Sequence, residues 1–263
     1  MHKQLIAILL FEFYCGTTSS AQKYRKEDYE FVVKYSSKEL SDDSIKNSEY
    51  FKSRGEAYYA LGDFNNALLD FNTYLKINPK DSYTYYNRGV VKNTLGKAND
   101  AVEDFSSAIK LSTDNPANSY FARGDAYHAL EDYPMAISDY KNALKHNPKH
   151  ENALNNLGLV FIEKKDFRTA ITYLNKALQL NADRVSCLFN RAYALIELEH
   201  YNEALTDLQN ALKISPNNPY ANNYMGYYLY RQNKKTEACK YFKIATSNGA
   251  HPMSNDLKNC DCE

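Results

Sequence analysis

The chain has 263 residues, of which 32 are Lys or Arg and 32 are Asp or Glu, so its formal net charge is zero. This balance excludes the bulk positive charge that is typical of nucleic-acid-binding proteins. With 9 Gly, 7 Pro and 44% hydrophobic residues, the chain has too few chain-breaking residues for a β-sandwich or for Pro/Gly-rich disorder, and enough apolar residues for a core.

Residues 1–21 have the layout of a secretory signal peptide. A short apolar run from Leu5 to Phe11 follows a basic start, and the small residues Ser19-Ser20-Ala21 predict cleavage before Gln22. The run is too short to cross a bilayer, and no later stretch is apolar enough to do so. We therefore expect a protein exported to the periplasm or secreted, and a cytoplasmic one if the signal does not function.

Lipidation of Cys15 is an alternative to simple cleavage, but Glu12-Phe13-Tyr14 lacks the small residues that normally precede such a cysteine. Residues 22–47 are charged and rich in Ser. One amphipathic stretch, Glu27 to Tyr35, predicts a partly helical segment, and a flexible connection is expected around Ser41 to Ser44.

From residue 48 to residue 252 the sequence repeats at an interval of 34 or 35 residues. Each repeat has two helical patterns, and three columns recur at their contact: a small residue, an alanine twelve positions later, and a large apolar residue four positions after that. The small residues are Gly55, Gly89, Gly124, Gly158, Ala192 and Gly226; the alanines are Ala67, Ala101, Ala136, Ala170, Ala204 and Ala238; the large residues are Phe71, Phe105, Tyr140, Leu174, Leu208 and Phe242. The small residues let two helices approach closely. Because no pair can bury its apolar face alone, neighbouring repeats must stack.

These columns resemble the signature of the tetratricopeptide-repeat (TPR) family, which is W-x2-L-G-x2-Y followed by A-x3-F and P. The resemblance covers six units: 48–81, 82–115, 117–150, 151–184, 185–218 and 219–252. It implies an all-α, right-handed TPR α-solenoid of helix-turn-helix repeats. We expect a capping helix from Pro252 to Cys260, within a C-terminal cap and tail of residues 253–263, to shield the last repeat.

The sequence departs from the family pattern in two columns. The family Trp is absent from every unit, and an Arg replaces the family Leu in four of them: Arg54, Arg88, Arg123 and Arg191. Neither departure removes the small-residue contacts, so the expected fold is unchanged.

Four cysteines lie outside the predicted signal. Cys239 and Cys260 lie on either side of the turn expected at Gly249-Ala250, so they would face each other in an antiparallel hairpin. We predict a disulfide between them, worth roughly 3 kcal/mol in the chain-entropy model, with Cys262 as the competing partner and free thiols as the alternative. Cys187 has the pattern of a small core residue.

Neither a metal nor a cofactor is predicted. Cys260-x-Cys262 is too tight for the usual zinc spacing, and Pro148 separates His146 from His150. The sequence has no Gly-rich phosphate loop, no G-x-S-x-G elbow and no paired Cys/His constellation. We therefore expect that the protein is not an enzyme.

The resemblance implies that first helices form the inner wall of a partner-binding groove. Tyr offers a large, rigid contact surface with one polar tip, and Asn can bond both the N–H and the C=O of an extended peptide. Asn87, Asn156 and Asn190 share the sixth position of their units and resemble the asparagine ladder of some peptide-binding TPR proteins, interrupted here by Ser53, Ala122 and Tyr224. The alternative is that the tyrosines pack between units. The implied wall residues are Tyr59, Tyr83, Tyr86, Asn87, Phe121, His128, Asn152, Asn155, Asn156, Phe189, Asn190, Tyr193, Tyr220, Asn223, Tyr227 and Tyr230.

One TPR subtype is excluded. Domains that clamp an acidic C-terminus need a basic and amide pattern over three units, which Lys52 and Asn87 fit. Glu56 replaces a required Asn, and Asn118 and Ala122 replace the final basic pair, so an acidic tail would meet a carboxylate.

We therefore expect a non-enzymatic scaffold that binds a peptide or a partner domain in its groove. Two alternatives stay open at this point. One is a carbohydrate or cell-wall binder, which the absence of Trp disfavours; the other is an accessory subunit of an extracytoplasmic enzyme complex. Partner identity and oligomeric state do not follow from the sequence.

Overall fold

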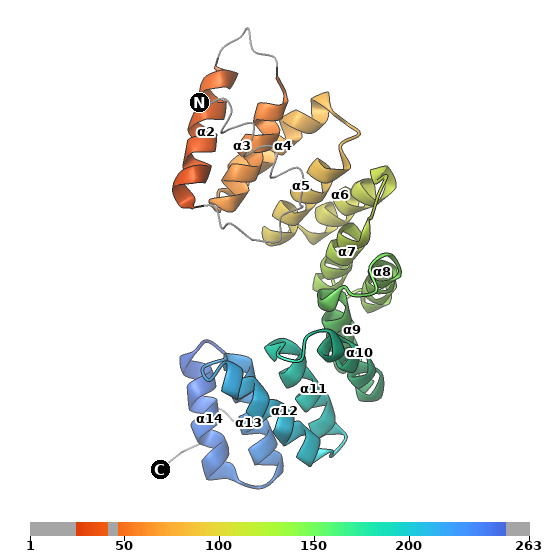
Figure 1. The fold of residues 1–263 in the computed structure, drawn as a ribbon, viewed down its shortest axis with the longest axis vertical. Helices are drawn as coiled ribbons and strands as arrows, with labels where there is room; N and C mark the ends of the chain where they lie inside the picture. The colour runs from red at the N-terminus through yellow and green to blue at the C-terminus, as the bar shows by residue number, and fades with distance from the viewer. Residues whose placement is uncertain (1–24, 42–46, 251–263) are drawn as a thin grey trace. The chain divides into compact units, whose positions relative to one another are not determined.

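The computed structural model describes residues 25–41 and 47–250. Within these residues the chain has thirteen α-helices and no strand, which confirms the all-α fold class (Figure 1). A single helix, α2 (Lys26–Leu40), comes first. Six helix pairs follow: α3 (Glu49–Ala60) with α4 (Phe64–Ile77), α5 (Ser82–Thr94) with α6 (Ala98–Leu111), α7 (Ala117–Ala129) with α8 (Tyr133–His146), α9 (Glu151–Glu163) with α10 (Phe167–Leu180), α11 (Val185–Glu197) with α12 (Tyr201–Ile214), and α13 (Pro219–Arg231) with α14 (Lys235–Ser247).

The helices form two compact units that divide after Asp132, within the third repeat. Unit 1 contains α2 to α7, and unit 2 contains α8 to α14. In each unit a helix packs against the next one along the chain, and the first helices of neighbouring repeats also contact one another. Stacking of repeats is thus the source of the core, as the repetitive apolar columns require.

Several expectations lie outside the described residues. These are the signal peptide of residues 1–21 with Cys15, most of the connection around Ser41 to Ser44, the capping helix, and the two C-terminal cysteines. Helix α2 extends beyond the amphipathic stretch Glu27 to Tyr35 that the sequence predicts. Ser36, in the added part, is 3% exposed, and α2 packs on α3. None of the described helices combines the length and the apolarity that a membrane span needs.

The small-residue column lies where the two helices of a repeat meet. A Cβ atom built on Gly55 or Gly89 would lie 2.8 Å from the ring of Phe71 or Phe105. The same atom on Gly158 would lie 2.6 Å from Leu174 Cγ. These distances are shorter than any van der Waals contact, so the large residue of each repeat occupies the space that a side chain would need.

A left-handed residue makes the turn inside each repeat. Gly62 and Gly96 follow the first helices α3 and α5 and have φ of 80° and 73°. The other four repeats have the same turn without glycine. The left-handed residue there has φ of about 60° and is Glu131, Lys165, Glu199 or Asn233.

Arg54, Arg88 and Arg191, which replace the family Leu, form ion pairs between the helices of a repeat. Arg191 binds Asp207 through two hydrogen bonds, of 2.7 Å from Nε and 2.6 Å from a terminal nitrogen. Arg54 with Asp70, and Arg88 with Asp104, have the same bidentate geometry. Each aspartate is at least 95% buried, so the pair satisfies a charge inside the repeat.

Each of these arginines also reaches back to the preceding helix. Arg88 and Arg191 donate to Asn72 and Asn175, which lie on the second helix of the previous repeat. Arg54 makes the equivalent bond to Ser37 on α2, at 3.0 Å. Helix α2 therefore occupies the place of a preceding second helix and covers the first repeat of unit 1.

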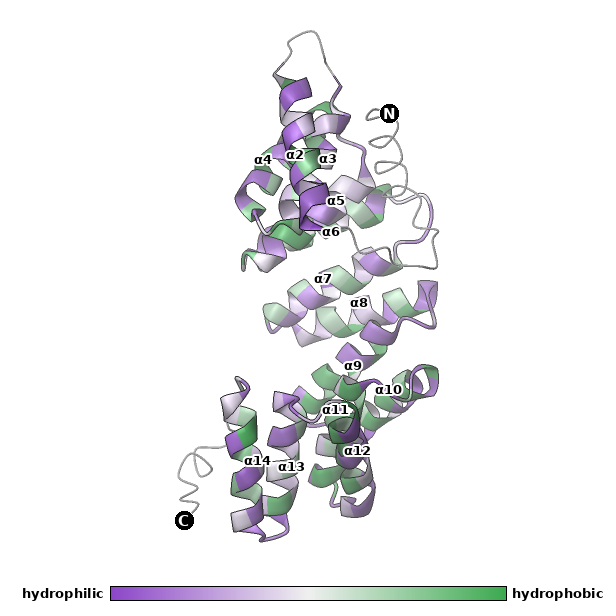
Figure 2. Ribbon diagram, turned by 60° about the vertical axis from the view of Figure 1, so that its left-hand side comes forward, coloured by the Kyte–Doolittle hydropathy of each residue, from purple (hydrophilic) through white to green (hydrophobic). Residues whose placement is uncertain are grey.

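The largest apolar cluster lies in unit 2, along α9 to α14. Figure 2 shows many hydrophobic residues on α9 to α12, whereas α5 in unit 1 is mostly hydrophilic. Ile162 on α9 and Ile196 on α11 belong to this core, with 8% and 0% exposure.

Candidate functional site

Five aromatic residues on α11 and α13 of unit 2 form a continuous cluster, here called the tyrosine cluster: Phe189, Tyr193, Tyr220, Tyr224 and Tyr227. Phe189 stacks on both Tyr220 and Tyr224, with ring centroids 5.7 Å apart in each case. Tyr193 lies 5.2 Å from Tyr224 and 5.8 Å from Tyr227. The rings therefore run from one repeat into the next, and Tyr220 is 57% exposed at the edge of the cluster.

The other end of the tyrosine cluster is polar. The Tyr227 hydroxyl donates to Glu197 at 2.6 Å, and Arg231 bonds both groups. Burial raises the pKa of Tyr193 and that of Tyr224 to about 12, so both hydroxyls stay protonated near neutral pH. The cluster thus offers ring faces and hydroxyl donors together.

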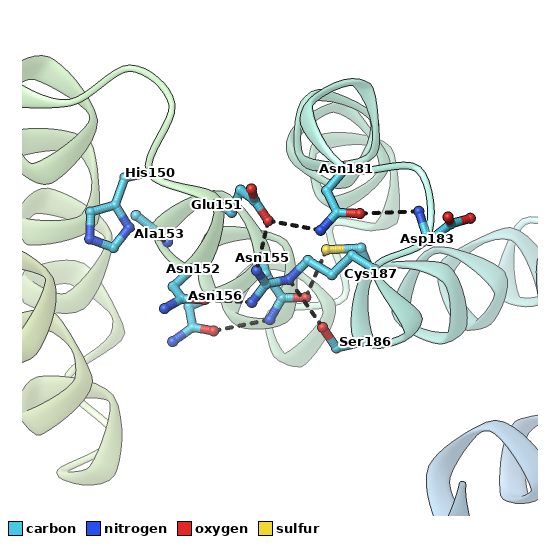
Figure 3. A network of polar contacts seen from close by, with 11 residues as sticks. His150, Glu151, Asn152, Ala153, Asn155, Asn156, Asn181, Asp183, Ser186 and Cys187 are labelled. Carbon is cyan, nitrogen blue, oxygen red and sulfur yellow. Dashed lines mark hydrogen bonds and ion pairs between the residues drawn. The ribbon is translucent and has the colours of Figure 1, made fainter. Parts of the chain in front are cut away.

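An amide network joins α9 to α11, the helix that also carries Phe189 and Tyr193; Figure 3 shows the part of it around Asn155. Asn155 is its centre: its Oδ1 accepts from Asn190 at 3.4 Å and from the Cys187 thiol at 3.2 Å, and its Nδ2 donates to Asn156 at 3.1 Å. Asn152, one turn earlier, is exposed and accepts from Arg184. Two of these amides, Asn152 and Asn156, therefore reach solvent.

The inner members of the network serve the fold. Asn155 and Asn190 are 8% and 4% exposed, and they bond each other across two repeats. Burial raises the pKa of Cys187 to about 11, so the thiol stays protonated and acts as a donor. The partial asparagine ladder expected at Asn87, Asn156 and Asn190 therefore includes one residue, Asn190, that is enclosed between helices.

The sixteen wall residues differ in exposure. Four are exposed: Tyr59, Tyr83, Asn152 and Tyr220. Eight are half-buried: Tyr86, Asn87, Phe121, His128, Asn156, Tyr193, Tyr227 and Tyr230. Four are buried: Asn155, Phe189, Asn190 and Asn223. The tyrosine cluster and the amide network bring together eight of the ten in unit 2, all but Asn223 and Tyr230. Of the six in unit 1, Tyr83 lines a separate pocket, and Asn87 donates to Glu56 of its lining.

That pocket, here called the lysine–glutamate pocket, has a volume of about 380 Å³ and lies at α3, α5 and the chain before α5. It is lined by Lys52, Glu56, Lys80, Asp81, Ser82, Tyr83, Leu111 and Thr113. The Lys52 side chain is 4% exposed, and its ammonium bonds Asp81 at 3.0 Å. It also lies over the rings of Tyr74 and Tyr83, 5.4 and 5.1 Å from their centroids.

The Glu56 carboxylate accepts fewer and longer hydrogen bonds than the Asp81 carboxylate. Burial raises the pKa of Glu56 from its ordinary value of 4.5 to about 7; the Lys52 ammonium opposes this shift, and nearby carboxylates add to it. Burial also acts on Asp81, but the backbone N–H of Thr84 and the Lys52 ammonium outweigh it and lower the pKa of Asp81. The hydrogen bond described for Glu56 is a long one, 3.5 Å from Asn87.

Replacing Glu56 by Gln is expected to raise the free energy of unfolding by about 1–3 kcal/mol at pH 8 and to change it little at pH 4. A carboxyl whose pKa is raised in the folded state loses its stabilising contribution as the pH rises from about 4.5 to about 7, and Gln does not titrate. Partial exposure of the side chain lowers the effect within this range.

Urea unfolding followed by circular dichroism at the two pH values measures this change. Glu103→Gln on the exposed face of α6 is the matched control, with no expected pH-dependent gain. An equal gain in the free energy of unfolding from Glu56→Gln at both pH values would contradict a raised pKa for Glu56.

Tyr224 and Glu56 are functional candidates that the sequence pattern did not single out as such. Tyr224 was taken as an interruption of the asparagine ladder, yet its ring joins Phe189 to Tyr193. Tyr224 holds the same repeat position as Asn190, and this position could have indicated that Tyr224 belongs to the site. The burial of Glu56 depends on side chains from another repeat, so no local pattern indicates it.

The remaining cysteine and metal expectations are only partly within the described residues. Cys239 lies in α14 and is 4% exposed, but both of its proposed partners are outside these residues, so the disulfide stays a prediction. Among residues 25–41 and 47–250, no group of three or more His, Cys, Asp or Glu side chains could hold a metal ion.

Three segments of the chain match known families. Residues 52–116 match the family described as tetratricopeptide repeat, residues 192–233 match TPR repeat, and residues 130–211 match anaphase-promoting complex, cyclosome, subunit 3. No curated protein matches the chain by sequence. Segments 52–116 and 192–233 therefore match TPR families, and the fold is an all-α TPR solenoid.

Solved structures support the same fold. The chain resembles the APC/C hetero-tetramer Cut9–Hcn1, with a TM-score of 0.73 and 17% identity over 90% of this chain and 45% of that chain. It resembles Pseudomonas aeruginosa pilF, with a TM-score of 0.67 and 20% identity over 80% and 95% of the two chains. YrrB, described as a TPR protein with an unusual peptide-binding site, has a TM-score of 0.57 and 16% identity over 72% and 96%.

Proposed function

We propose that this protein is a non-enzymatic scaffold whose first helices bind an extended peptide segment of a partner protein. The observation that carries the proposal is the tyrosine cluster beside the solvent-facing amides of α9. Tyrosine rings bury a large area at low entropic cost, and amides bond the backbone of an extended chain. The peptide-binding site named for YrrB, on the same fold, supports this function.

Three substitutions at solvent-facing positions test the proposal with little damage to the core: Tyr220→Ala, Asn152→Ala and Asn156→Ala, combined in one variant. Peptides are first selected from a displayed random library with the full chain as bait. The variant is expected to bind the selected peptides at least about tenfold more weakly, because truncating such contacts costs about 1 kcal/mol or more each. Fluorescence anisotropy with labelled peptides measures the affinity.

A matched control carries one large apolar and two amide substitutions on α12: Ile214→Ala, Gln209→Ala and Asn210→Ala, all at exposed positions. It is expected to bind as the original chain does. Equal affinity of the two variants would contradict a site on the first helices. Binding of purified glycans by the original chain, in the absence of any peptide ligand, would favour the carbohydrate alternative.

We also propose that the scaffold is exported after cleavage before Gln22, as an extracytoplasmic protein or as a subunit of an extracytoplasmic complex. The layout of residues 1–21 supports this location. N-terminal sequencing of the mature chain tests it, since an intact N-terminus at Met1 would exclude cleavage.

A further inference from the structure

The lysine–glutamate pocket of unit 1 contains more carboxylate than its internal cations satisfy. Asp81 is bonded by Lys52, by the Tyr74 hydroxyl and by the backbone of Thr84. Glu56 lines the same cavity with a single long bond from Asn87. No ion pair of Glu56 is described, and the Lys52 ammonium that acts on its charge is bonded to Asp81, so burial of the Glu56 carboxylate is costly.

The pocket is poorly suited to an anion. The Lys52 ammonium is enclosed by Asp81 and by two aromatic rings, so it cannot reach a ligand without breaking its own ion pair. Lys80 is the other cation of the lining, and it is exposed at the rim. An incoming carboxylate or phosphate would face both Glu56 and Asp81.

The same walls suit a cation. Tyr83 is 45% exposed, so its ring can receive a guanidinium or ammonium group in addition to the contact it makes with Lys52. A guanidinium would also give Glu56 charge-assisted hydrogen bonds, which are shorter and stronger than the 3.5 Å bond it now accepts. The volume of about 380 Å³ admits an arginine side chain.

We propose that the lysine–glutamate pocket receives a basic side chain of the partner, an arginine or a lysine, which pairs with the Glu56 carboxylate against the Tyr83 ring. The proposal rests on the peptide-binding function in one respect, that the ligand belongs to a protein. It adds the chemistry of a second contact, located in unit 1 and separate from the tyrosine cluster.

Binding of such a cation is coupled to the protonation of Glu56. The groups that face Glu56 are Lys52 and Glu49 on α3, Lys80 and Asp81 before α5, and Tyr83 and Asn87 on α5. The pKa of Asp81 is lowered and that of Tyr83 is raised, so neither changes charge near neutral pH. With a pKa of about 7 for Glu56, the dissociation constant for arginine should be about eightfold larger at pH 6 than at pH 7.5.

The experiment is a titration of the ¹⁵N-labelled full chain, followed by amide NMR shifts, with the amide derivatives of N-acetyl-arginine, N-acetyl-glutamine and N-acetyl-glutamate. The arginine derivative is expected to shift amides around Glu56 and Tyr83 and to show the eightfold pH dependence. Glu56→Gln should weaken its binding at least about tenfold at pH 7.5 and remove the pH dependence. Glu103→Gln should bind as the original chain does.

A charge-reversed variant, Glu56→Lys, should prefer the glutamate derivative, and circular dichroism checks that both Glu56 variants remain helical. The proposal is overturned if the glutamate or glutamine derivative shifts the same amides as strongly as the arginine derivative. It is also overturned if no derivative shifts them, or if Glu56→Gln leaves arginine binding unchanged. The peptide-affinity measurement at Tyr220, Asn152 and Asn156 is independent, so failure of either site is seen separately.

Discussion

Replacing Asp207 by Ala is expected to lower the free energy of unfolding by about 2–4 kcal/mol. The Asp207 carboxylate is 5% exposed and holds the Arg191 guanidinium through two bonds of 2.6 and 2.7 Å. Its removal leaves a partly buried cation with only the Asn175 side chain of the previous repeat as a described partner. Urea unfolding of the full chain, followed by circular dichroism, measures the loss.

A pair of residues in repeat four suggests a second substitution that compensates for the loss of Asp207. Repeat four carries Leu157 and Tyr173 at the two positions that Arg191 and Asp207 occupy in repeat five. The double variant Arg191→Leu with Asp207→Tyr should recover most of the lost stability, because an apolar pair can replace a buried ion pair at little cost. Asp183→Ala, at an exposed position, is the control for loss of a carboxylate. A double variant less stable than Asp207→Ala would contradict this equivalence.

Replacing Gly226 by Val is expected to lower the free energy of unfolding by about 2–4 kcal/mol, through overpacking and a poorer helix-forming residue. A Cβ atom at this position would lie 2.6 Å from Phe242 Cε1 and 2.7 Å from Cδ1. Because Phe242 is only 3% exposed, its ring has little room to move away. The midpoint and slope of urea unfolding measure the effect.

Repeat five again offers the compensating pair, Ala192 with Leu208. The variant Gly226→Ala with Phe242→Leu should therefore lie within about 1.5 kcal/mol of the original chain, as volume-conserving changes usually do. Lys243→Val on the exposed face of α14 measures the cost of valine in a helix alone, expected to be below about 0.7 kcal/mol. A loss at Gly226→Val no greater than this would mean that the glycine is not required by packing.

The fold could be predicted because its signal recurs. A single small residue twelve residues before an alanine is weak evidence of a helix contact, but six such pairs at an interval of 34 or 35 residues specify both the helices and the distance between them. The helix pairs α3–α4 to α13–α14 follow from that repetition. The arginine column was visible in the same way, and its aspartate partners lie sixteen residues later, as in Arg54 and Asp70.

The candidate site could be predicted only in outline. The repeat position assigned Tyr193, Tyr220 and Tyr227 to a common wall, and the structure places them in one aromatic cluster with Phe189. The repeat position does not indicate that Asn190 is enclosed, because Asn190 is buried against Asn155 of another repeat. Nor does the repeat position indicate that the Tyr224 ring contacts both Phe189 and Tyr193.

The sequence by itself determined the helices, their pairing and the small-residue contacts, since these depend on residues close together in one repeat and recur in all six repeats. Only the tertiary structure decided which polar side chains of the first helices remain open to a ligand. Burial of Asn155 and Asn190, the contact of Lys52 with the Tyr83 ring, and the long bond from Asn87 to Glu56 each join two repeats. Such contacts depend on how side chains from different repeats fill a shared space, and periodicity along the chain does not specify that packing.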